Sequence, residues 1–278
     1  MNTQSIILVG NPDSGKSNFI GRLWLALQSK KFSLLAASQP NDIKYVEELA
    51  AYLLQGKFAP RTDKDTTTRD FNIDVKSKEK GITAELVIPD VSGELWRSAV
   101  ETFEIPLKWL NLISNSNGAL LFVRVRSPLN TQPLDWVNSK ALMSLADQDQ
   151  QNVIPTQVRL IELLRFLEEK LTKVKNFKPK VAVVVTAWDL LHHEEQAMGP
   201  EHYLDIEFPM FAGRLLESQK LNIKVFGSSV VGGDFNIAEF VSQYLNGDIE
   251  NAGYIVTKEK NGWQNIPDIT LPIDWLLS

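Results

Sequence analysis

Hydrophobic residues follow two different spacings along this chain, and the two alternate. Short apolar runs rich in β-branched residues are separated by longer stretches in which apolar residues recur at helical spacing. Strands bury alternate residues or whole runs, whereas helices bury every third or fourth residue, so the alternation predicts an α/β protein built from βαβ units. We expect strands at 5–9, 71–77, 82–88, 118–125, 180–186 and 222–227.

The expected strands differ in how much of their surface is covered. "FNIDVKS" at 71–77 alternates apolar and polar residues, which is typical of a half-exposed strand at a sheet edge. "VAVVV" at 181–185 is apolar throughout, which is typical of a strand covered on both faces. The first is therefore predicted at the edge of the sheet and the second at its centre.

Helices are expected at 16–30, 42–55, 95–113, 156–174, 201–219 and 237–246. The fourth shows the clearest period, with apolar residues at Val158, Ile161, Leu164, Leu167 and Leu171. Two stretches, 32–61 and 127–154, read as insertions, and the second carries a polar "DQDQQN" run typical of a surface segment. No repeat or flexible linker interrupts the pattern, so residues 1–278 are expected to form one elaborated domain.

Composition narrows the class of protein. A net charge of -5 argues against a dedicated nucleic-acid binder, which normally presents a basic face. The absence of cysteine excludes disulfides and thiolate metal sites and fits a reducing compartment. The N-terminal apolar run reads as a strand instead of a signal peptide, and no segment is long enough in apolar residues to cross a bilayer. We expect a soluble cytoplasmic protein that has neither a membrane nor a nucleic-acid partner.

The most informative motif is "LVGNPDSGKSNF" at residues 8–19. It contains the pattern G-x-x-x-x-G-K-[ST] between a predicted strand and a predicted helix, which is the setting of a phosphate-binding loop. Gly10 and Gly15 would let backbone amides converge on phosphate oxygens, and the helix N-terminus would add its dipole. Lys16 would reach the β and γ phosphates, and Ser17 would offer its hydroxyl to Mg²⁺. The neighbouring candidates for nucleotide contact are Asp13, Ser14 and Asn18.

Two further segments carry candidates for the γ phosphate and the metal. In "LVIPDVSGE" at 86–94, Asp90 ends an apolar strand where it can support Mg²⁺, and Gly93 can offer its amide to the γ phosphate. In "DTTTRDFNI" at 65–73, one threonine should close over Mg²⁺ when the γ phosphate is present. Thr68 is favoured by its distance from the next strand, and Thr66 and Thr67 remain candidates.

Base recognition is predicted from two segments in the second half of the chain. "VVVTAWDLL" at 183–191 places Thr186 and Asp189 just past a buried strand. A carboxylate there can accept hydrogen bonds from N1 and N2 of guanine, an arrangement that adenine does not offer. "VFGSSVVGGD" at 225–234 follows the last strand, and the backbone of Ser228 or Ser229 is a candidate for contact with the guanine O6. The expected ligands are GTP or GDP with Mg²⁺.

With these four segments in this order, the sequence resembles the P-loop GTPases of the translation-factor and Ras-like class over nearly its whole length. The resemblance implies a three-layer αβα fold with a six-stranded, mostly parallel sheet and helical insertions, binding GTP and Mg²⁺. More narrowly, "TAWDLL", "VFGSSVVGGD" and "ITLPIDWLL" look like the bacterial double-GTPase families, predicted components of multi-gene conflict or immunity systems. That likeness implies nucleotide-gated binding to proteins encoded by neighbouring genes.

The sequence departs from this pattern at two positions. Ala187 replaces the lysine whose aliphatic stem covers the guanine ring in most such GTPases, and Trp188 or another aromatic residue is a candidate to take over that packing. Glu94 stands where Ras-like enzymes place the glutamine that orients the attacking water. Glu94 either acts on that water or forms a structural ion pair in the loop. No arginine finger can be assigned, since a solvated surface role is expected for Arg61, Arg69 and Arg97.

The function expected from the sequence is a GTP-binding switch that hydrolyses GTP slowly and couples its nucleotide state to a protein partner. The residues expected to act in hydrolysis are Lys16, Thr68, Gly93 and Glu94, and those expected to hold Mg²⁺ are Ser17, Thr68 and Asp90. One alternative is a nucleotide-binding scaffold with little turnover. The other is a P-loop ATPase or kinase, which would need a second acidic residue where Val91 stands, or an arginine-rich lid. The oligomeric state is left open.

Overall fold

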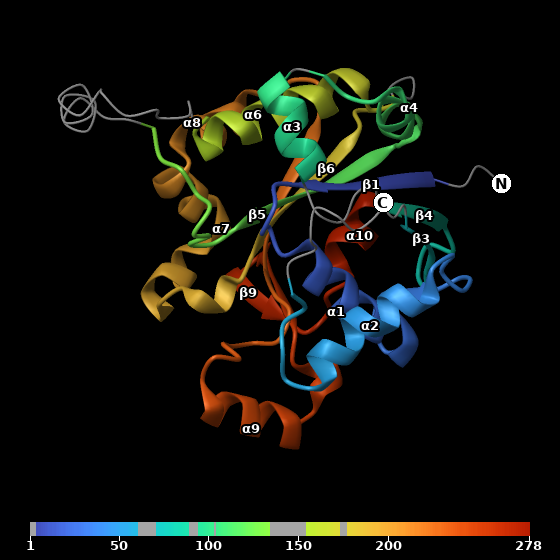
Figure 1. Ribbon diagram of the computed structural model, residues 1–278, viewed down its shortest axis with the longest axis vertical. Coiled ribbons are helices and arrows are strands. Elements are labelled where there is room, and N and C mark those ends of the chain that lie inside the picture. The colour runs from blue at the N-terminus through green and yellow to red at the C-terminus, as the bar shows by residue number, and fades with distance from the viewer. Residues whose placement is uncertain (1–3, 61–70, 89–93, 103, 134–153, 173–176) are drawn as a thin grey trace.

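A computed structural model describes residues 4–60, 71–88, 94–102, 104–133, 154–172 and 177–278 (Figure 1). The alternation of short apolar runs with amphipathic stretches produces one mixed sheet with helices on both faces, as a βαβ pattern predicts. Within the described residues the strand order is β2-β3-β4-β1-β5-β6-β7-β8-β9. The chain is therefore an α/β protein of three layers.

The centre of the sheet is parallel, and its two margins are antiparallel. All six predicted strands are present, and they are β1 Gln4–Gly10, β3 Phe71–Ser77, β4 Thr83–Ile88, β5 Gly118–Arg124, β6 Lys180–Thr186 and β7 Asn222–Ser229. Every residue of β6 after its first is buried, so its central position is confirmed.

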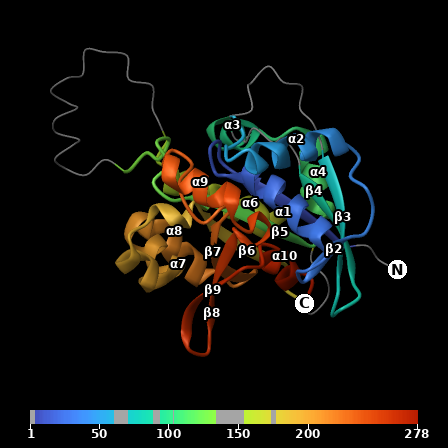
Figure 2. The ribbon, with the colours of Figure 1, turned by 90° about the horizontal axis from the view of Figure 1, so that it is seen from below.

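The described part of the sheet has nine strands, so the expectation of six was too low. The additional strands are β2 Leu34–Ala36, β8 Tyr254–Glu259 and β9 Gly262–Ile266. β2 is too short to show a period in sequence, and it pairs with the second half of β3. β3 is consequently the second strand of the sheet, and its prediction as the edge strand was wrong. β8 and β9 form a hairpin that extends the other margin (Figure 2).

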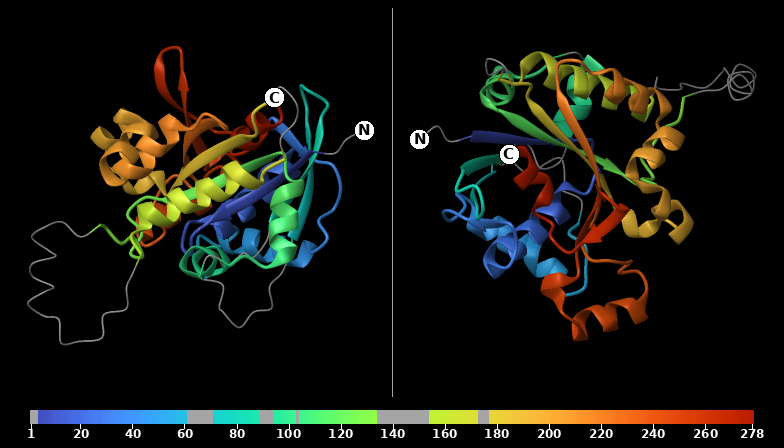
Figure 3. Two further views of the ribbon diagram at one scale, coloured as in Figure 1. Left: turned by 90° about the horizontal axis from the view of Figure 1, so that it is seen from above. Right: turned by 180° about the vertical axis from the view of Figure 1, so that it is seen from behind.

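The alternation of side chains along the central strands divides the apolar residues between two cores. Ile6 and Leu8 of β1 face one helical layer, which consists of α1 Lys16–Ser29, α2 Ile43–Leu54 and α10 Leu271–Leu276. Ile7 and Val9 face the other layer, which consists of α3 Glu94–Thr102, α4 Leu107–Asn115, α6 Thr156–Lys170, α7 His193–Glu207 and α8 Pro209–Glu217. Figure 3 shows the two layers on opposite sides of the sheet. The carboxyl ends of the parallel strands lie between them.

Two predicted helices are each divided in the structure, and proline explains both breaks. The helix expected at 95–113 is α3 followed by α4, with Pro106 immediately before α4. α7 is kinked at Gly199, whose φ is +84°, so its second part begins at Pro200, next to the predicted start at 201. The helix expected at 201–219 is then broken before Pro209, which is the first residue of α8. Proline lacks the amide hydrogen that a continuing helix needs, but it is tolerated in a first turn. No helix in the described residues combines the length and apolar character needed to cross a bilayer.

The insertion predicted at 32–61 contains β2 and α2, and it packs tightly against α1. A Cβ atom on Gly21 of α1 would lie 2.9 Å from the backbone carbonyl of Leu49, so the two helices approach closely because position 21 has no side chain. Of the second insertion, 127–154, only residues 127–133 and 154 are described. The remaining elements are η1 Trp188–Leu190, α9 Ala238–Asn246 and η2 Ile249–Asn251.

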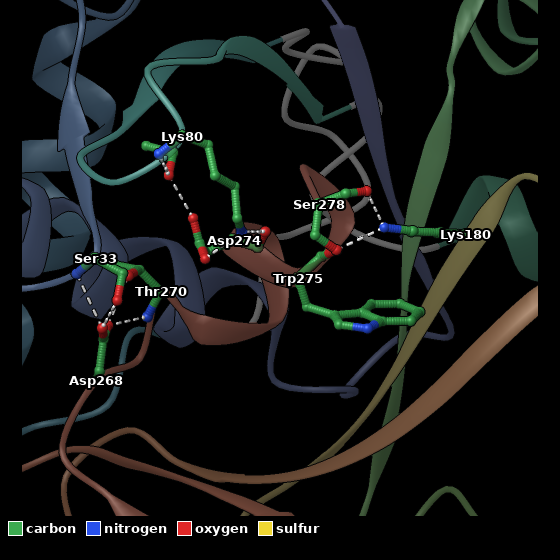
Figure 4. A network of polar contacts seen from close by, with 9 residues as sticks. Ser33, Lys80, Lys180, Asp268, Thr270, Asp274, Trp275 and Ser278 are labelled. Atoms are coloured by element: carbon green, nitrogen blue, oxygen red, sulfur yellow. Dashed lines mark hydrogen bonds and ion pairs between the residues drawn. The ribbon is translucent and has the colours of Figure 1, made fainter.

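The C-terminal segment docks onto the domain, as the apolar "PIDWLL" predicts. Ile273, Leu276 and Leu277 are buried in the core beneath the sheet. Polar contacts fasten the same segment at three places (Figure 4). They are Lys80 Nζ with Asp274 Oδ2 at 2.5 Å, Lys180 Nζ with the backbone oxygens of Trp275 and Ser278, and Asp268 Oδ2 with the backbone amide of Ser33 at 2.9 Å.

Candidate functional site

The loop between β1 and α1 requires glycine at both ends. A Cβ atom on Gly10 would lie 2.8 Å from Ser14 Oγ and 3.0 Å from Phe122 Cβ. Gly15 has a φ of +86° and is the N-cap of α1, and a Cβ atom there would lie 3.0 Å from Thr186 Oγ1. The loop therefore closes on itself and on β6 at distances that only glycine allows at these two positions.

The ammonium group of Lys16 is held at the centre of this loop. Its Nζ donates to the carbonyls of Gly10 at 2.8 Å and Asn11 at 3.0 Å, and to Ser14 Oγ at 3.2 Å. Lys16 is only 3% exposed. Ser17 follows it in the first turn of α1 and is half-buried. A buried cation at a helix N-terminus, surrounded by backbone dipoles, is an electrostatic environment that attracts anions.

Thr186 connects this loop to the segment predicted to recognise the base. Its Oγ1 donates to the carbonyl of Ser14 at 2.8 Å, from the end of β6. Ala187 follows with a φ of +56°, and this left-handed residue turns the chain into η1, which contains Asp189. The position of Asp189 is thus coupled to the loop through one hydrogen bond and one turn.

Asp189 is a half-buried carboxylate in an unusual environment. Burial raises the pKa of Asp189, because removing solvent disfavours the ionised form. The Ser229 hydroxyl and the charge of Arg124 oppose this rise, whereas Asp234 adds to it. A carboxylate that burial destabilises gains most from a ligand that donates hydrogen bonds to it.

One cleft of about 410 Å³ joins Lys16 and Asp189, a size within the range of small-ligand sites. Its walls come from the loop after β1, the start of α1, the segment after α2 and the ends of β5, β6 and β7. The lining residues are Pro12, Asp13, Ser14, Gly15, Lys16, Ser17, Asn18, Phe58, Ala59, Pro60, Arg124, Leu129, Thr186, Ala187, Asp189, Leu190, Val230, Asp234 and Asn236.

Two of the predicted ligand-binding residues make structural contacts. Asp13 Oδ1 accepts from Arg124 Nη1 at 2.6 Å, and Asp13 Oδ2 accepts from Ser127 Oγ at 2.8 Å. Asn18 Oδ1 accepts from the amide of Ala59 at 2.9 Å, which holds the segment after α2 against the start of α1. Both residues border the cleft, and both shape its walls.

Ser228 and Ser229 are fully buried and do not line the cleft. Ser229 Oγ accepts from the amide of Gly232 at 2.8 Å. The residues of this segment that do reach the cleft are Val230 and Asp234, and the Val230 carbonyl accepts from Arg22 Nε of α1 at 2.5 Å. Sequence reasoning passed over Val230 because an apolar residue after a strand carries no chemical signal of its own.

Trp188 points away from the cleft, so of the two candidates to cover the base Trp188 is wrong, and Phe58, which lines the cleft, is the aromatic residue that remains. Its ring is fully buried in the core beside α7 and meets the ring of Tyr203 edge to face at 6.0 Å. The backbone turn at Ala187 explains the difference, because it directs Asp189 toward the cleft and the intervening side chain into the core.

Several predicted site residues lie outside the described residues, namely Thr66, Thr67, Thr68, Asp90 and Gly93, together with Arg61 and Arg69. Glu94 and Arg97 belong to α3, but their side chains are not described. The structure adds Arg124 and Phe58 to the cleft wall, and neither was predicted. Arg124 ends an apolar strand, the same kind of position as Thr186, and that placement was a signal available in the sequence.

Comparison with known proteins identifies a family. Two solved structures align with the chain at 13% identity each. The bacterial selenocysteine-specific elongation factor EF-Sec has a TM-score of 0.39, with 88% of this chain and 29% of that chain covered. The S. cerevisiae Ski7 GTPase-like domain bound to GTP has a TM-score of 0.40, with 82% and 43% covered. The chain thus spans less than half of either structure, and no curated protein is significantly similar to it in sequence. The model of the Double-GTPase 1 family matches residues 7–276, and this chain belongs to that family.

Proposed function

We propose that this protein is a GTP-binding switch that hydrolyses GTP slowly in the presence of Mg²⁺ and couples its nucleotide state to the binding of a protein partner. The observation that carries the proposal is the single cleft with a glycine-bounded phosphate loop and Lys16 at one end and Asp189 at the other. Membership of a GTPase family supports the choice of a guanine nucleotide.

The phosphate end of the cleft fits a triphosphate. Gly10 and Gly15 let the loop pack against Ser14 and Thr186 where a Cβ atom would collide, and the Lys16 ammonium faces three oxygen atoms within this loop. A phosphate oxygen can replace the neutral Ser14 hydroxyl as a partner of this ammonium, which exchanges a neutral hydrogen bond for a charge-assisted one. Lys16 is therefore assigned to the β and γ phosphates.

An oxygen donor set for Mg²⁺ is available from the residues predicted in sequence. Ser17 borders the cleft beside Lys16, and we assign Thr68 and Asp90, outside the described residues, to the same ion. Hydroxyl and carboxylate oxygens are the ligands that Mg²⁺ prefers. When bound, the ion would neutralise charge on the phosphate oxygens.

The base end of the cleft is assigned to guanine. We assign Asp189 to the two guanine donors and the backbone amide of Val230, the residue after Ser229, to the exocyclic oxygen, because both residues line the cleft. Thr186 holds this end at a constant distance from the phosphate loop through its bond to Ser14. Recognition of the base and of the phosphates thus depends on one connected framework.

The switch is assigned to the segments that contain Thr68 and Gly93. Loss of the γ phosphate would release both residues, and the affinity for a partner would change with them. Glu94, the first residue of α3, brings a negative charge where Ras-like enzymes use a neutral side chain, so we expect slow hydrolysis without a partner. By family likeness, we place the partner among the proteins encoded by neighbouring genes of a bacterial defence system.

Nucleotide binding is tested with a fluorescent GTP analogue and Mg²⁺, displaced in competition by unlabelled GTP or ATP. We expect GTP to displace it much more effectively than ATP. Lys16→Ala should weaken binding by roughly 30-fold or more, because it removes a buried cation from the phosphates. Lys44→Ala, which removes an exposed lysine from α2, is the matched control and should leave the affinity unchanged. Equal displacement by ATP would exclude the guanine assignment.

Hydrolysis is tested separately by multiple-turnover release of phosphate, with and without the products of neighbouring genes. We expect slow release by the isolated chain and acceleration by one of those products. Binding without release under either condition would instead support the alternative, in which GTP is a structural ligand of a scaffold. Rapid release by the isolated chain would contradict the proposed dependence on a partner.

A further inference from the structure

Arg124 lies on the cleft wall between the phosphate end and the base end. It is the last residue of β5 and is paired in register with Thr186 on β6. Side chains alternate along a strand, and Phe122, two residues earlier, packs against Phe19 of α1 with ring centroids 5.1 Å apart. Arg124 therefore projects on the α1 face of the sheet, the face that carries the phosphate loop, and it lines the cleft.

A second charged residue fixes where the Arg124 guanidinium lies. Asp13 Oδ1 accepts from Arg124 Nη1 at 2.6 Å, and Ser127 Oγ holds the other oxygen of the same carboxylate. The side chain of Asp13 is 9% exposed, whereas that of Arg124 is 31% exposed. The pair is thus anchored at the Asp13 side, and the rest of the guanidinium borders the cleft.

Phe58 lines the cleft from the segment after α2, whereas the segment after β6 offers no lysine stem to cover a purine ring. Ala187 offers only a methyl group to the face of a purine, and Trp188 is directed into the core. Ala187 directly follows Thr186, the register partner of Arg124, so the two residues lie on adjacent strand ends. A guanidinium is planar and weakly hydrated, and it stacks on aromatic faces.

Electrostatics agrees with this placement. Burial is the main cause that raises the pKa of Asp189, and the positive charge of Arg124 is among the influences that oppose the rise. Arg124 is therefore close enough to Asp189 to affect its ionisation, although its ion pair is with Asp13. The Arg124 guanidinium thus interacts with Asp13 of the loop after β1 and with Asp189 at the base end of the cleft.

We propose that Arg124 packs its guanidinium against the guanine ring and so replaces the lysine stem that Ala187 lacks, with Asp13 as the positioning residue that holds it there. This inference rests on the proposed binding of GTP. Under this proposal a residue of β5 covers the guanine ring, whereas in most GTPases of this kind a lysine in the segment after β6 covers it.

The test compares three ligands, each with Mg²⁺, on the purified full chain: GTP, GDP and inorganic tripolyphosphate. Each competes with a fluorescent GTP analogue. Arg124→Ala should weaken GTP and GDP by the same factor, about 3- to 30-fold, and leave tripolyphosphate unchanged, because the lost contact is to the base. Arg124→Lys, which keeps a stem and a charge but not a planar fork, should lie between the wild type and Arg124→Ala.

Two further variants separate this role from a purely structural one. Arg165→Ala removes an arginine of α6 that pairs with Glu162 at 2.8 Å and Glu169 at 3.1 Å and does not line the cleft, so nucleotide affinity should be unchanged. The Asp13→Asn/Arg124→Ala double variant removes both charges and leaves no unpaired carboxylate. It should reproduce the loss of Arg124→Ala for GTP and GDP, and urea unfolding without ligand checks that each variant folds.

The outcomes distinguish the two proposals. A loss larger for GTP and tripolyphosphate than for GDP would overturn the inference and assign Arg124 to the γ phosphate. No loss in Arg124→Ala, with the wild type binding GTP, would show that the ion pair only shapes the loop. Failure of the wild type to bind any of the three ligands would instead refute the proposed function.

Discussion

Gly15 is a position where one added methyl group should disturb both stability and nucleotide binding. Its φ of +86° lies in the left-handed region, and a Cβ atom there would lie 3.0 Å from Thr186 Oγ1 and 3.2 Å from Thr186 Cβ. Gly15→Ala therefore combines backbone strain with a collision against the residue that binds Ser14. Gly81, in the turn between β3 and β4, has a φ of +66° with no atom within 4 Å of an added Cβ, so Gly81→Ala isolates the strain alone.

The expected loss of stability follows from the backbone strain and, for Gly15→Ala, from the added steric collision. A left-handed conformation costs an alanine about 1–2 kcal/mol, and the stiffer unfolded chain offsets about 0.4–1 kcal/mol of that. Gly81→Ala should consequently lower the free energy of unfolding by about 1 kcal/mol. Gly15→Ala adds overpacking of about 1–3 kcal/mol, because Thr186 is held between two strands and cannot withdraw freely. Its total cost should be about 2–4 kcal/mol.

The assay is urea unfolding of both variants without nucleotide, followed by titration with the fluorescent GTP analogue. Gly15→Ala should also weaken nucleotide binding, since it displaces the Thr186 hydroxyl from the Ser14 carbonyl. Gly81→Ala should bind as the wild type does. If Gly15→Ala destabilised the protein no more than Gly81→Ala, the close contact between the phosphate loop and β6 would be refuted.

Two other predictions concern Asp189 and Arg22. Burial raises the pKa of Asp189, so the folded protein binds the Asp189 proton more tightly than the unfolded chain does. The free energy of unfolding therefore falls as the pH rises from the ordinary aspartate pKa through the raised pKa of the folded protein. Asp189→Asn should therefore make the nucleotide-free protein more stable at neutral pH, and urea unfolding at a series of pH values should show this gain vanishing toward acid. Its affinity for GTP should fall by about 10- to 100-fold, because a charge-assisted acceptor is lost. Unchanged affinity for GTP would contradict the role of Asp189 in binding the base. Arg22, 1% exposed, donates to the carbonyls of Val230 and Ile249 at 2.5 Å each and to the Tyr244 hydroxyl at 2.7 Å. Arg22→Met should lower the free energy of unfolding by about 2–5 kcal/mol, since it leaves two carbonyls without donors, and it should weaken GTP binding because Val230 lines the cleft. Arg165→Met, at an exposed side chain, is the control. Equal stability of the two variants would argue against a structural role of Arg22.

The helix boundaries show where one-dimensional periodicity stops being informative. The apolar period continues through 95–113 and 201–219, but Pro106 and Pro209 divide both stretches. These breaks were available in the sequence, because proline interrupts a helix beyond its first turn. The β2 strand was not available, because three residues show no period and pair only after β3 is in place.

The candidate site also contains residues that the sequence pattern identifies and residues that only the fold brings to it. Gly10, Gly15 and Lys16 are recognisable because their spacing along one loop is itself the motif, and the structure brings them together as expected. Val230 follows β7 and, as an apolar residue, has no chemical signal of its own, whereas the position of Arg124 at the end of β5 was the signal that sequence reasoning overlooked. Trp188 was misplaced for a related reason, since adjacency to Asp189 in sequence does not decide which way a side chain points.

The sequence by itself determined the α/β class, the five parallel strands with β3 beside them, and the glycine-bounded loop around Lys16, because each depends on interactions between residues close together in the chain. Only the tertiary structure decided the order of nine described strands, the burial that raises the pKa of Asp189, and the Asp13–Arg124 pair. These features depend on contacts between residues that are tens to more than a hundred positions apart, or on exclusion of solvent by the whole fold. Periodicity and spacing record neither of these.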